Sequence, residues 1–309
     1  MQLTVLQGFA ILKAAWEAGI NTIDTANAYS NGESEKPIGN FIVKYKIPRE
    51  NLVIMTKALA LVSKEISGFP PFNPILPNTR DYVNLGGLSR TALFNQVEAS
   101  LGRLKTAYID VLQIHAGDPT TPYEETMKAL HDLVVSGKVR YIGACNLKAW
   151  QFAEMNHIAE TKGWTQFVSM QVEHSLLYRT EEQEMFAYCK YKGIGVLSYS
   201  PLMEGHLARL LNTSTPRSDY VRNSSFEKKV RSSDAEIIER AQELTSKHGW
   251  KMSDVALAWS VTKVSSPIVG ANSVQRVNEA IVSGKSLAED EMKYLEELYE
   301  PQPSRMWLV

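Results

Sequence analysis

Residues 108–115 read Tyr-Ile-Asp-Val-Leu-Gln-Ile-His, a nearly continuous apolar segment that ends on a histidine. A short apolar run without strict alternation is typical of a parallel strand buried on both faces. After one helical stretch, residues 137–143, Gly-Lys-Val-Arg-Tyr-Ile-Gly, begin another run of the same kind. A strand, a helix and a second strand in this order predict a βαβ unit and a parallel sheet.

The same alternation extends in both directions along the chain. Gly19, Gly137 and Gly193 stand where left-handed helix caps are expected, each shortly before a strand. Seven strands are predicted, at residues 20–25, 52–56, 110–115, 141–145, 167–172, 195–199 and 267–271. The predicted helices include residues 10–18, 89–104, 123–136, 149–161, 181–192 and 253–262.

Two α/β architectures are compatible with this alternation. A doubly wound open sheet would carry a glycine-rich phosphate turn after an early strand. Gly86-Gly87 instead follows a proline-rich loop. A (β/α)8 TIM barrel fits the length and the repetition better, and it places functional side chains at the C-terminal ends of several strands. Since no internal linker is evident, we expect one barrel domain over residues 1–309.

Composition excludes several classes of protein. The 33 Lys and Arg residues nearly balance the 34 Asp and Glu residues, so nothing favours nucleic acid or an anionic membrane as a partner. Cys145 and Cys189 are too few for a disulfide framework and lack metal-ligand spacing, so no metal is expected. Neither a membrane-spanning run nor a signal peptide is recognisable. We therefore expect a cytoplasmic protein that acts on a small molecule.

Four titratable residues follow successive strands. Asp24, Lys57 and His115 each lie at a strand end, and Tyr29 comes five residues after Asp24. A phenol with a pKa of about 10 is a poor acid at neutral pH, and a nearby ammonium lowers that pKa. Tyr29 would donate the proton, Lys57 would tune it, Asp24 would orient Lys57, and His115 would bond to a carbonyl oxygen. Each residue alone has common structural roles, but together they predict carbonyl reduction.

From Ile11 onward the chain resembles the aldo-keto reductase superfamily, and within it the fungal aryl-alcohol-dehydrogenase-like and norsolorinic-acid-reductase-like branch. The resemblance covers nearly the whole chain in order. It lies in Ala18-Gly-Ile-Asn-Thr-Ile-Asp-Thr-Ala-Asn, Tyr29-Ser-Asn-Gly-Glu-Ser-Glu, Val53-Ile-Met-Thr-Lys, Gly87-Leu-Ser-Arg, and the two segments quoted first.

The resemblance implies a catalytic tetrad of Asp24, Tyr29, Lys57 and His115, and a nicotinamide cofactor. The residues that would contact this cofactor are Asp24, Asn146, Gln171, Tyr199, Ser200, Pro201, Leu202, Gly205, Gly270, Asn272, Ser273, Arg276 and Glu279. Asn146 and Gln171 would hold the carboxamide, and Tyr199 would stack on the ring. A guanidinium near a helix N-terminus suits a 2′-phosphate, so Arg276 favours NADPH; the alternative is a solvated arginine.

The chain also departs from the family pattern. Members normally begin earlier, with a hairpin and the first barrel strand, whereas Met1–Phe9 matches the start of the first helix. The barrel is therefore expected either to lack both elements or to use residues 1–6 in their place. His115-Ala-Gly-Asp replaces His-Arg-Phe-Asp, Cys145 replaces a serine, and Glu173-His-Ser replaces an amide-and-aromatic run. We expect Cys145 to be buried, and His174 and His206 to have surface roles.

Two other functions compete with the reductase. A nucleotide-binding regulatory or scaffold barrel with little turnover is the alternative that the shorter start suggests, and the complete tetrad argues against it. A barrel lyase or isomerase is weaker, because metal ligands and a monophosphate loop are not evident. Substrate choice is expected to depend on residues 58–88, 203–233 and the tail at 301–309.

Overall fold

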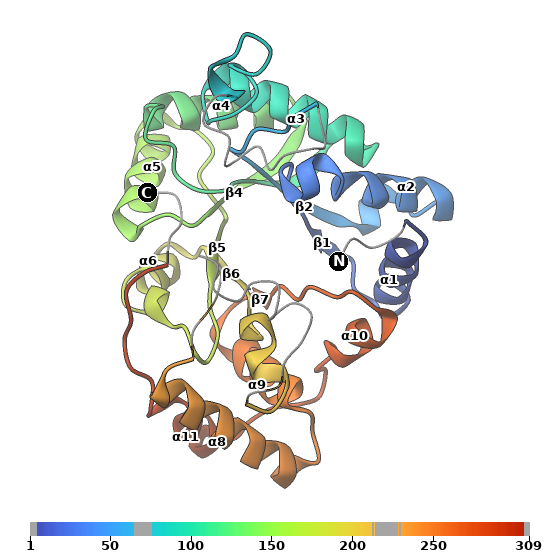
Figure 1. Cartoon of the computed structure of the whole chain (residues 1–309). Helices are drawn as coiled ribbons and strands as arrows, with labels where there is room; N and C mark the ends of the chain where they lie inside the picture. The colour runs from blue at the N-terminus through green and yellow to red at the C-terminus, as the bar shows by residue number, and fades with distance from the viewer. Residues whose placement is uncertain (1–4, 65–75, 212, 214–227, 229, 306–309) are drawn as a thin grey trace. The chain divides into compact units, whose positions relative to one another are not determined.

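The computed structural model describes residues 5–64, 76–211, 213, 228 and 230–305 (Figure 1). The chain groups into two compact units. The first holds the residues up to Gln171 together with Tyr188–Ile194, and the second holds Val172–Ala187 and Gly195–Arg305. The prediction of a single barrel domain over residues 1–309 stays a prediction.

The first unit is built on parallel strands that pair in chain order. They are β1 (Thr22–Asp24), β2 (Val53–Ala58), β3 (Ile109–Ile114), β4 (Val139–Cys145) and β5 (Ser169–Glu173), of which β5 continues into the second unit after Gln171. The register places Lys57 opposite Gln113, Gln113 opposite Gly143, and Gly143 opposite Ser169. Parallel pairing brings the C-terminal ends of these strands to one edge, which is where the polar side chains described below lie.

Helices separate the strands of the first unit. They are α1 (Val5–Glu17), α2 (Glu35–Tyr45), α3 (Arg90–Leu104), α4 (Tyr123–Val135), α5 (Ala149–Lys162) and α6 (Met185–Lys192). The first turn of α6 belongs to the second unit. Short 3-10 turns lie at η1 (Tyr29–Gly32), η2 (Arg49–Asn51) and η4 (Leu76–Asn78). Along the series from α1 to α5, each helix packs on the next (Figure 1). Helix α3 begins where the Ser89 hydroxyl accepts a hydrogen bond from the Ala92 amide, and α5 ends at Gly163 with φ of 66°.

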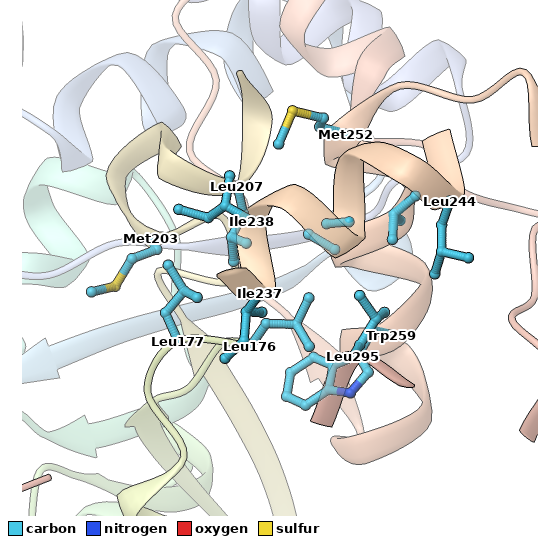
Figure 2. Packing of buried hydrophobic residues seen from close by; sticks show 13 residues of the cluster. Leu176, Leu177, Met203, Leu207, Ile237, Ile238, Leu244, Met252, Trp259 and Leu295 are labelled. Atoms are coloured by element: carbon cyan, nitrogen blue, oxygen red, sulfur yellow. The ribbon is translucent and has the colours of Figure 1, made fainter. Parts of the chain in front are cut away.

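The second unit pairs β6 (Gly195–Tyr199) in parallel with β7 (Ser266–Pro267). Its other elements are η5 (Thr180–Glu182), η6 (Met203–Ala208), α8 (Ser232–His248), α9 (Met252–Lys263), α10 (Val274–Glu279) and α11 (Glu289–Glu296). Helix α8 packs on α9 and α11 around a cluster of buried apolar side chains that includes Leu176, Ile237 and Trp259 (Figure 2). The indole of Trp259 is fully buried, and its Nε1 donates to Glu296 Oε1 at 2.8 Å.

All seven predicted strands are present; the strand at 195–199 has the predicted bounds, and the other six differ. The first and last are shorter than predicted, Thr22–Asp24 and Ser266–Pro267. The three glycine caps are confirmed, since Gly19, Gly137 and Gly193 all have positive φ. The predicted start of the first helix at residue 10 was wrong, because α1 begins at Val5. Val5 and Leu6 are therefore helical, so residues 5 and 6 do not form the strand that was considered for residues 1–6. Residues 1–4 lie outside the described residues.

The predicted helix at 181–192 also differs, because the structure divides it into η5 and α6. Helices α2, α8, α10 and α11 were not among the predicted ones. Much of the two long loops lies outside the described residues, at 65–75 and 214–227. In the part of the chain that the structure describes, we find no helix with the length and apolar character needed to cross a membrane.

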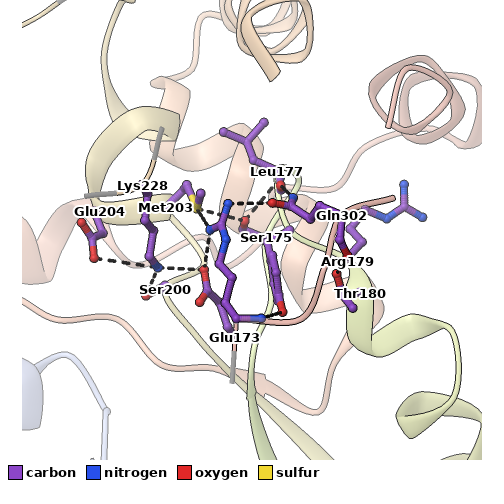
Figure 3. Close-up of polar contacts among 12 residues, drawn as sticks. Glu173, Ser175, Leu177, Arg179, Thr180, Ser200, Met203, Glu204, Lys228 and Gln302 are labelled. Atoms are coloured by element: carbon purple, nitrogen blue, oxygen red, sulfur yellow. Dashed lines mark hydrogen bonds and ion pairs between the residues drawn. The ribbon is translucent and has the colours of Figure 1, made fainter. Parts of the chain in front are cut away.

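A buried carboxylate organises the polar side of the second unit (Figure 3). Glu173, which is 4% exposed at the end of β5, accepts from Lys228 Nζ at 2.7 Å and from Arg305 Nη1 at 3.1 Å. The tail is held further because Gln302 donates to the Leu177 carbonyl at 2.7 Å and the Arg305 amide donates to Tyr178 Oη at 2.9 Å. Residues 301–305 are thus attached along the segment that follows β5.

Glu181 is another buried carboxyl in this unit, and its surroundings disfavour the ionised form. Burial raises its pKa to about 7, and the negative charge of Glu173 adds to the increase. The folded state therefore keeps the proton between the ordinary pKa of 4.5 and about 7, whereas the unfolded state releases it. The contribution of Glu181 to stability therefore falls as the pH rises through this window and stays level above it.

We predict that Glu181→Gln stabilises the protein at pH 8 much more than at pH 5. The glutamine has no proton to lose, so the gain in free energy of unfolding should reach about 2 to 3 kcal/mol at pH 8. Urea unfolding at both pH values measures it. The exposed Glu184→Gln is the control, and an equal change in both variants at both pH values would contradict the prediction.

Candidate active site

A buried ion pair lies at the C-terminal edge of β1 and β2. Lys57 Nζ donates to Asp24 Oδ2 at 2.6 Å and to the Thr25 carbonyl at 3.0 Å. The Lys57 side chain has no exposed surface, and only 9% of the Asp24 side chain is exposed. Adjacent parallel strands bring the two residues together, because Asp24 ends β1 and pairs with Met55, two residues before Lys57. The predicted orientation of Lys57 by Asp24 is therefore present in the structure.

Two aromatic rings complete this group. The ring centroid of Tyr29, in η1, lies 5.0 Å from Lys57 Nζ and 5.6 Å from the centroid of the His115 imidazole. His115 follows the last residue of β3, and its amide donates to the Ala58 carbonyl at 2.9 Å. Asp24, Tyr29, Lys57 and His115 thus form one cluster, as predicted from their positions at successive strand ends.

Burial and neighbouring charges shift the pKa values of Lys57, His115 and Tyr29. Burial is the largest effect and opposes the charge of Lys57, but Asp24, Tyr29 and Cys145 together outweigh it and the pKa of Lys57 is raised. Burial lowers the pKa of His115 to about 3, and the positive charge of Lys57 acts in the same direction. The imidazole is therefore neutral at physiological pH, and it can donate one hydrogen bond and accept another.

The ionisation of Tyr29 differs from the prediction. We expected the ammonium of Lys57 to lower the pKa of Tyr29, and its charge does act in that direction. Although 41% of Tyr29 is exposed, burial has the larger effect and the net pKa is raised. The phenol is therefore protonated at neutral pH, which is the state that a proton donor requires.

A buried pair of amides lies beside Asp24. Gln171 Nε2 donates to Asp24 Oδ1 at 2.9 Å, and Gln113 Nε2 donates to the same oxygen at 3.2 Å. Gln171 Nε2 also lies 3.3 Å from Gln113 Oε1. Sequence reasoning selected Gln171 but missed Gln113. The signal that could have found it is a polar residue at the C-terminal end of a mostly apolar strand, whose other polar residue is Asp110.

The C-terminal end of β4 carries a buried cysteine, Cys145, followed by a residue with left-handed backbone, Asn146. Asn146 has φ of 53°, in the left-handed region, and its Nδ2 donates to the His115 carbonyl at 3.2 Å. Cys145 is buried as expected, and burial raises the pKa of its thiol to about 12. Its Sγ lies 3.9 Å from Gln171 Oε1, so the thiol is at most a weak donor there.

The second unit contains a tight turn directly after β6. Ser200, Met203, Glu204 and Gly205 all have positive φ. Gly205 has φ of 100°, a backbone conformation that favours glycine, and a Cβ there would lie 2.3 Å from Arg209 Nη2, so this guanidinium would have to move. The amides of Met203 and Gly205 donate inside the turn, to the carbonyls of Ser200 and Leu202, both at 2.8 Å. The predicted residues Tyr199, Ser200, Pro201, Leu202 and Gly205 all belong to this turn or to the strand end before it.

The last predicted group lies around α10. Ser273 caps this helix, accepting a hydrogen bond from the Arg276 amide at 3.3 Å. The Arg276 side chain is 49% exposed, and its nearest acidic partner is Glu279, at 3.9 Å. Glu279 itself is paired with Lys251 at 3.0 Å. Gly270 and Asn272 precede the cap. The arrangement leaves the Arg276 guanidinium accessible to an anion.

The structure contradicts the predicted surface role for one of two histidines. The prediction of a surface role for His174 was wrong, because its ring has no exposed surface, stacks on Trp259 with centroids 5.1 Å apart, and bonds to Glu182 Oε1 at 2.7 Å. His206 is of intermediate exposure. Asp118 is the last residue of the altered segment His115-Ala-Gly-Asp. Its carboxylate accepts a hydrogen bond from the Leu88 amide at 2.7 Å and so holds the loop before α3.

Comparison with known proteins places these features in a family. A model of the aldo/keto reductase family matches residues 6–300. An aldo-keto reductase of Fusarium vanettenii is 49% identical over 301 residues, which are 95% of this chain and 81% of that protein. A Schizosaccharomyces pombe protein named for aryl-alcohol dehydrogenase activity is 45% identical over 305 residues, covering 96% and 92%. Versiconal hemiacetal acetate reductase of Aspergillus parasiticus is 43% identical over 302 residues, covering 96% and 88%.

We predict that Asp24→Asn destabilises the protein because it leaves the buried Lys57 without a counter-charge. The loss should be about 3 to 5 kcal/mol, the usual cost of breaking a buried pair from one side. The double variant Asp24→Asn/Lys57→Met should recover part of it. Urea unfolding measures each variant.

Asp81→Asn is the control for this prediction, since Asp81 is 58% exposed and faces Arg80 at 3.5 Å. An exposed pair of this kind contributes about 1 kcal/mol or less. The prediction would be contradicted if Asp24→Asn cost no more than Asp81→Asn.

Proposed function

The chain belongs to the aldo/keto reductase family, and from this premise we propose that it is an NADPH-dependent reductase of aldehydes or ketones. The family implies an oxidoreductase that acts on carbonyl groups and a (β/α)8 barrel, with which the parallel strands in chain order are consistent. The observation that carries the proposal is the cluster of Asp24, Tyr29, Lys57 and His115 at one strand edge.

The four side chains divide the work of protonating a carbonyl oxygen. NADPH, when bound, supplies the hydride that adds to the carbonyl carbon. Tyr29 donates its phenolic proton to the oxygen, and the ammonium of Lys57 stabilises the phenolate that remains. Neutral His115 donates a hydrogen bond to the same oxygen, because its low pKa keeps the imidazole uncharged. Asp24 keeps Lys57 charged and fixes its position.

The cofactor contacts are proposed in each unit separately. In the first unit, Asp24, Asn146 and Gln171 would contact the nicotinamide end, and amide groups are suitable partners for a carboxamide. In the second unit, Tyr199 would stack on the nicotinamide ring. The turn with Ser200, Pro201, Leu202 and Gly205 would hold the pyrophosphate, and Gly270, Asn272, Ser273, Arg276 and Glu279 would contact the adenosine phosphate. The accessible guanidinium of Arg276 supports a phosphate-bearing ligand.

The substrate class follows from the relatives. Because one similar protein is named for aryl-alcohol dehydrogenase activity and another for hemiacetal acetate reduction, we propose aromatic or aliphatic aldehydes as substrates, with aryl-alcohol oxidation as the reverse reaction. We propose a cytoplasmic location and no nucleic-acid or membrane partner, since the net charge of −1 favours neither.

We predict that Tyr29→Phe abolishes reduction of 4-nitrobenzaldehyde and leaves NADPH binding intact. Removing the general acid should lower kcat by a factor of about 10² to 10⁴. Absorbance of NADPH follows turnover, and quenching of tryptophan fluorescence follows binding.

Tyr141→Phe, at an exposed position on β4, is the matched control and should keep full activity. If Tyr29→Phe retained wild-type turnover, Tyr29 would not be the acid. If the folded wild-type protein bound NADPH but reduced no aldehyde or ketone, the reductase proposal would fail and a regulatory barrel would replace it.

We predict that Arg276→Ala weakens binding of NADPH but not of NADH, because only NADPH carries the 2′-phosphate. A hydrogen bond between charged groups is worth about 1.5 to 3 kcal/mol, so the dissociation constant should rise about tenfold to a hundredfold. Arg80→Ala, where the side chain is 95% exposed, removes the same charge elsewhere and is the control. Equal weakening of both cofactors would contradict the assignment of Arg276 to the phosphate.

A further inference from the structure

Gln113 is a buried polar residue for which the proposed reaction has no role. It lies in β3, two residues before His115, and has no exposed surface. Both ends of its side-chain amide are bonded within the cluster, the nitrogen to Asp24 and the oxygen to Gln171. An amide in an apolar strand costs free energy unless it is fully hydrogen-bonded. An apolar side chain would avoid that cost, so the presence of Gln113 beside Asp24 needs a functional explanation.

Gly143 allows the Gln113 side chain to reach across the sheet. Gln113 lies on β3 and Gln171 on β5, with β4 between them, and Gly143 is the β4 residue opposite Gln113. A Cβ at Gly143 would lie 3.1 Å from Gln113 Cγ and 2.5 Å from Ser169 Oγ. The missing side chain therefore makes room for Gln113 to pass over β4.

The acceptors around Gln171 determine which way its amide faces. The carboxylate of Asp24 only accepts, so the amide atom that contacts it must be nitrogen. Gln171 Nε2 lies 2.9 Å from Asp24 Oδ1 and 3.3 Å from Gln113 Oε1, and an amide nitrogen has two N–H groups. Both donors are thereby used. Within the described residues, the one donor recorded near Gln171 Oε1 is the weak Cys145 thiol at 3.9 Å.

We propose that Gln113 is a positioning residue that fixes the Gln171 amide so that its oxygen accepts a hydrogen bond from the carboxamide NH₂ of the nicotinamide. This inference rests on the proposed cofactor. Asp24 alone would hold one N–H of Gln171 and leave the second without a buried acceptor. Gln113 supplies that acceptor, and it links the group that holds Lys57 to the group that holds the cofactor.

The test compares NADP⁺ with its 3-acetylpyridine analogue, in which a methyl group replaces the carboxamide NH₂. Wild-type protein should bind NADP⁺ about threefold to tenfold more tightly than the analogue, which is the effect of one hydrogen bond. In Gln113→Met this ratio should fall to near one, because only NADP⁺ loses a contact. Isothermal titration calorimetry gives both dissociation constants, so the result does not depend on turnover.

A double-mutant cycle separates positioning from a general structural effect. Gln171→Leu removes the acceptor, so Gln113→Met should change the ratio no further in that background. Gln113→Asn keeps the amide but is one methylene too short to reach Gln171, and it should behave like Gln113→Met. The control is Gln96→Met, which removes another buried glutamine, bonded to Asn27 and the backbone at Leu59 and Gly87. It should leave the ratio unchanged.

The binding ratios distinguish a positioning role of Gln113 from the alternatives. A ratio that falls in Gln113→Met and Gln113→Asn, but not in Gln96→Met or further in the double variant, supports the role of Gln113. A wild-type protein that binds NADP⁺ and the analogue equally, or an unchanged ratio in Gln113→Met, overturns that role and leaves the proposed function standing. If the folded wild-type protein binds neither nucleotide, the proposed function fails and the inference fails with it.

Discussion

The ion pair between Lys57 and Asp24 is the interaction on which the candidate site depends. Two charges removed from water lose hydration energy that their mutual attraction recovers only when the geometry is good and the other hydrogen-bonding positions are filled. Here Lys57 Nζ lies 2.6 Å from the carboxylate and also reaches the Thr25 carbonyl, while two amides occupy the other carboxylate oxygen. The parallel register from β1 to β5 makes this possible, since it places the side chains of Lys57, Gln113 and Gln171 at one edge.

The buried positive charge also determines the state of its neighbours. It helps to keep His115 neutral, with a pKa of about 3, and it opposes the burial that raises the pKa of Tyr29. A neutral imidazole and a protonated phenol beside a fixed ammonium are the states that carbonyl reduction requires. Buried ion pairs contribute little net stability on average, so the effect of this one on His115 and Tyr29 is the better explanation for it.

In the second unit, carboxylates serve packing and attachment. The buried Glu173 binds both Lys228 and Arg305 (Figure 3), and the partly exposed Glu182 bonds to the buried His174. Where the family pattern is lost around residues 173–175, Glu173 is paired with two cations, whereas the buried His174 bonds through Nε2 and its Nδ1 has no hydrogen-bond partner among the described residues. Glu181 is the exception, because Glu173 lies near it and its pKa is raised. These contacts attach the tail at residues 301–305 without using any residue of the proposed tetrad.

The sequence by itself determined the order of the strands, their parallel pairing and the family. Apolar runs with glycine caps predict strands because burial on both faces leaves no alternation, and this holds for the segment ending at His115. It also determined which residues gather at the strand ends, since parallel strands share one edge. Their ionisation depends on tertiary structure, because pKa values follow from burial and distances that no spacing encodes; Tyr29 was misjudged for this reason. The contacts of Gln113 and the burial of His174 likewise depend on the fold, because their partners lie on other strands and helices.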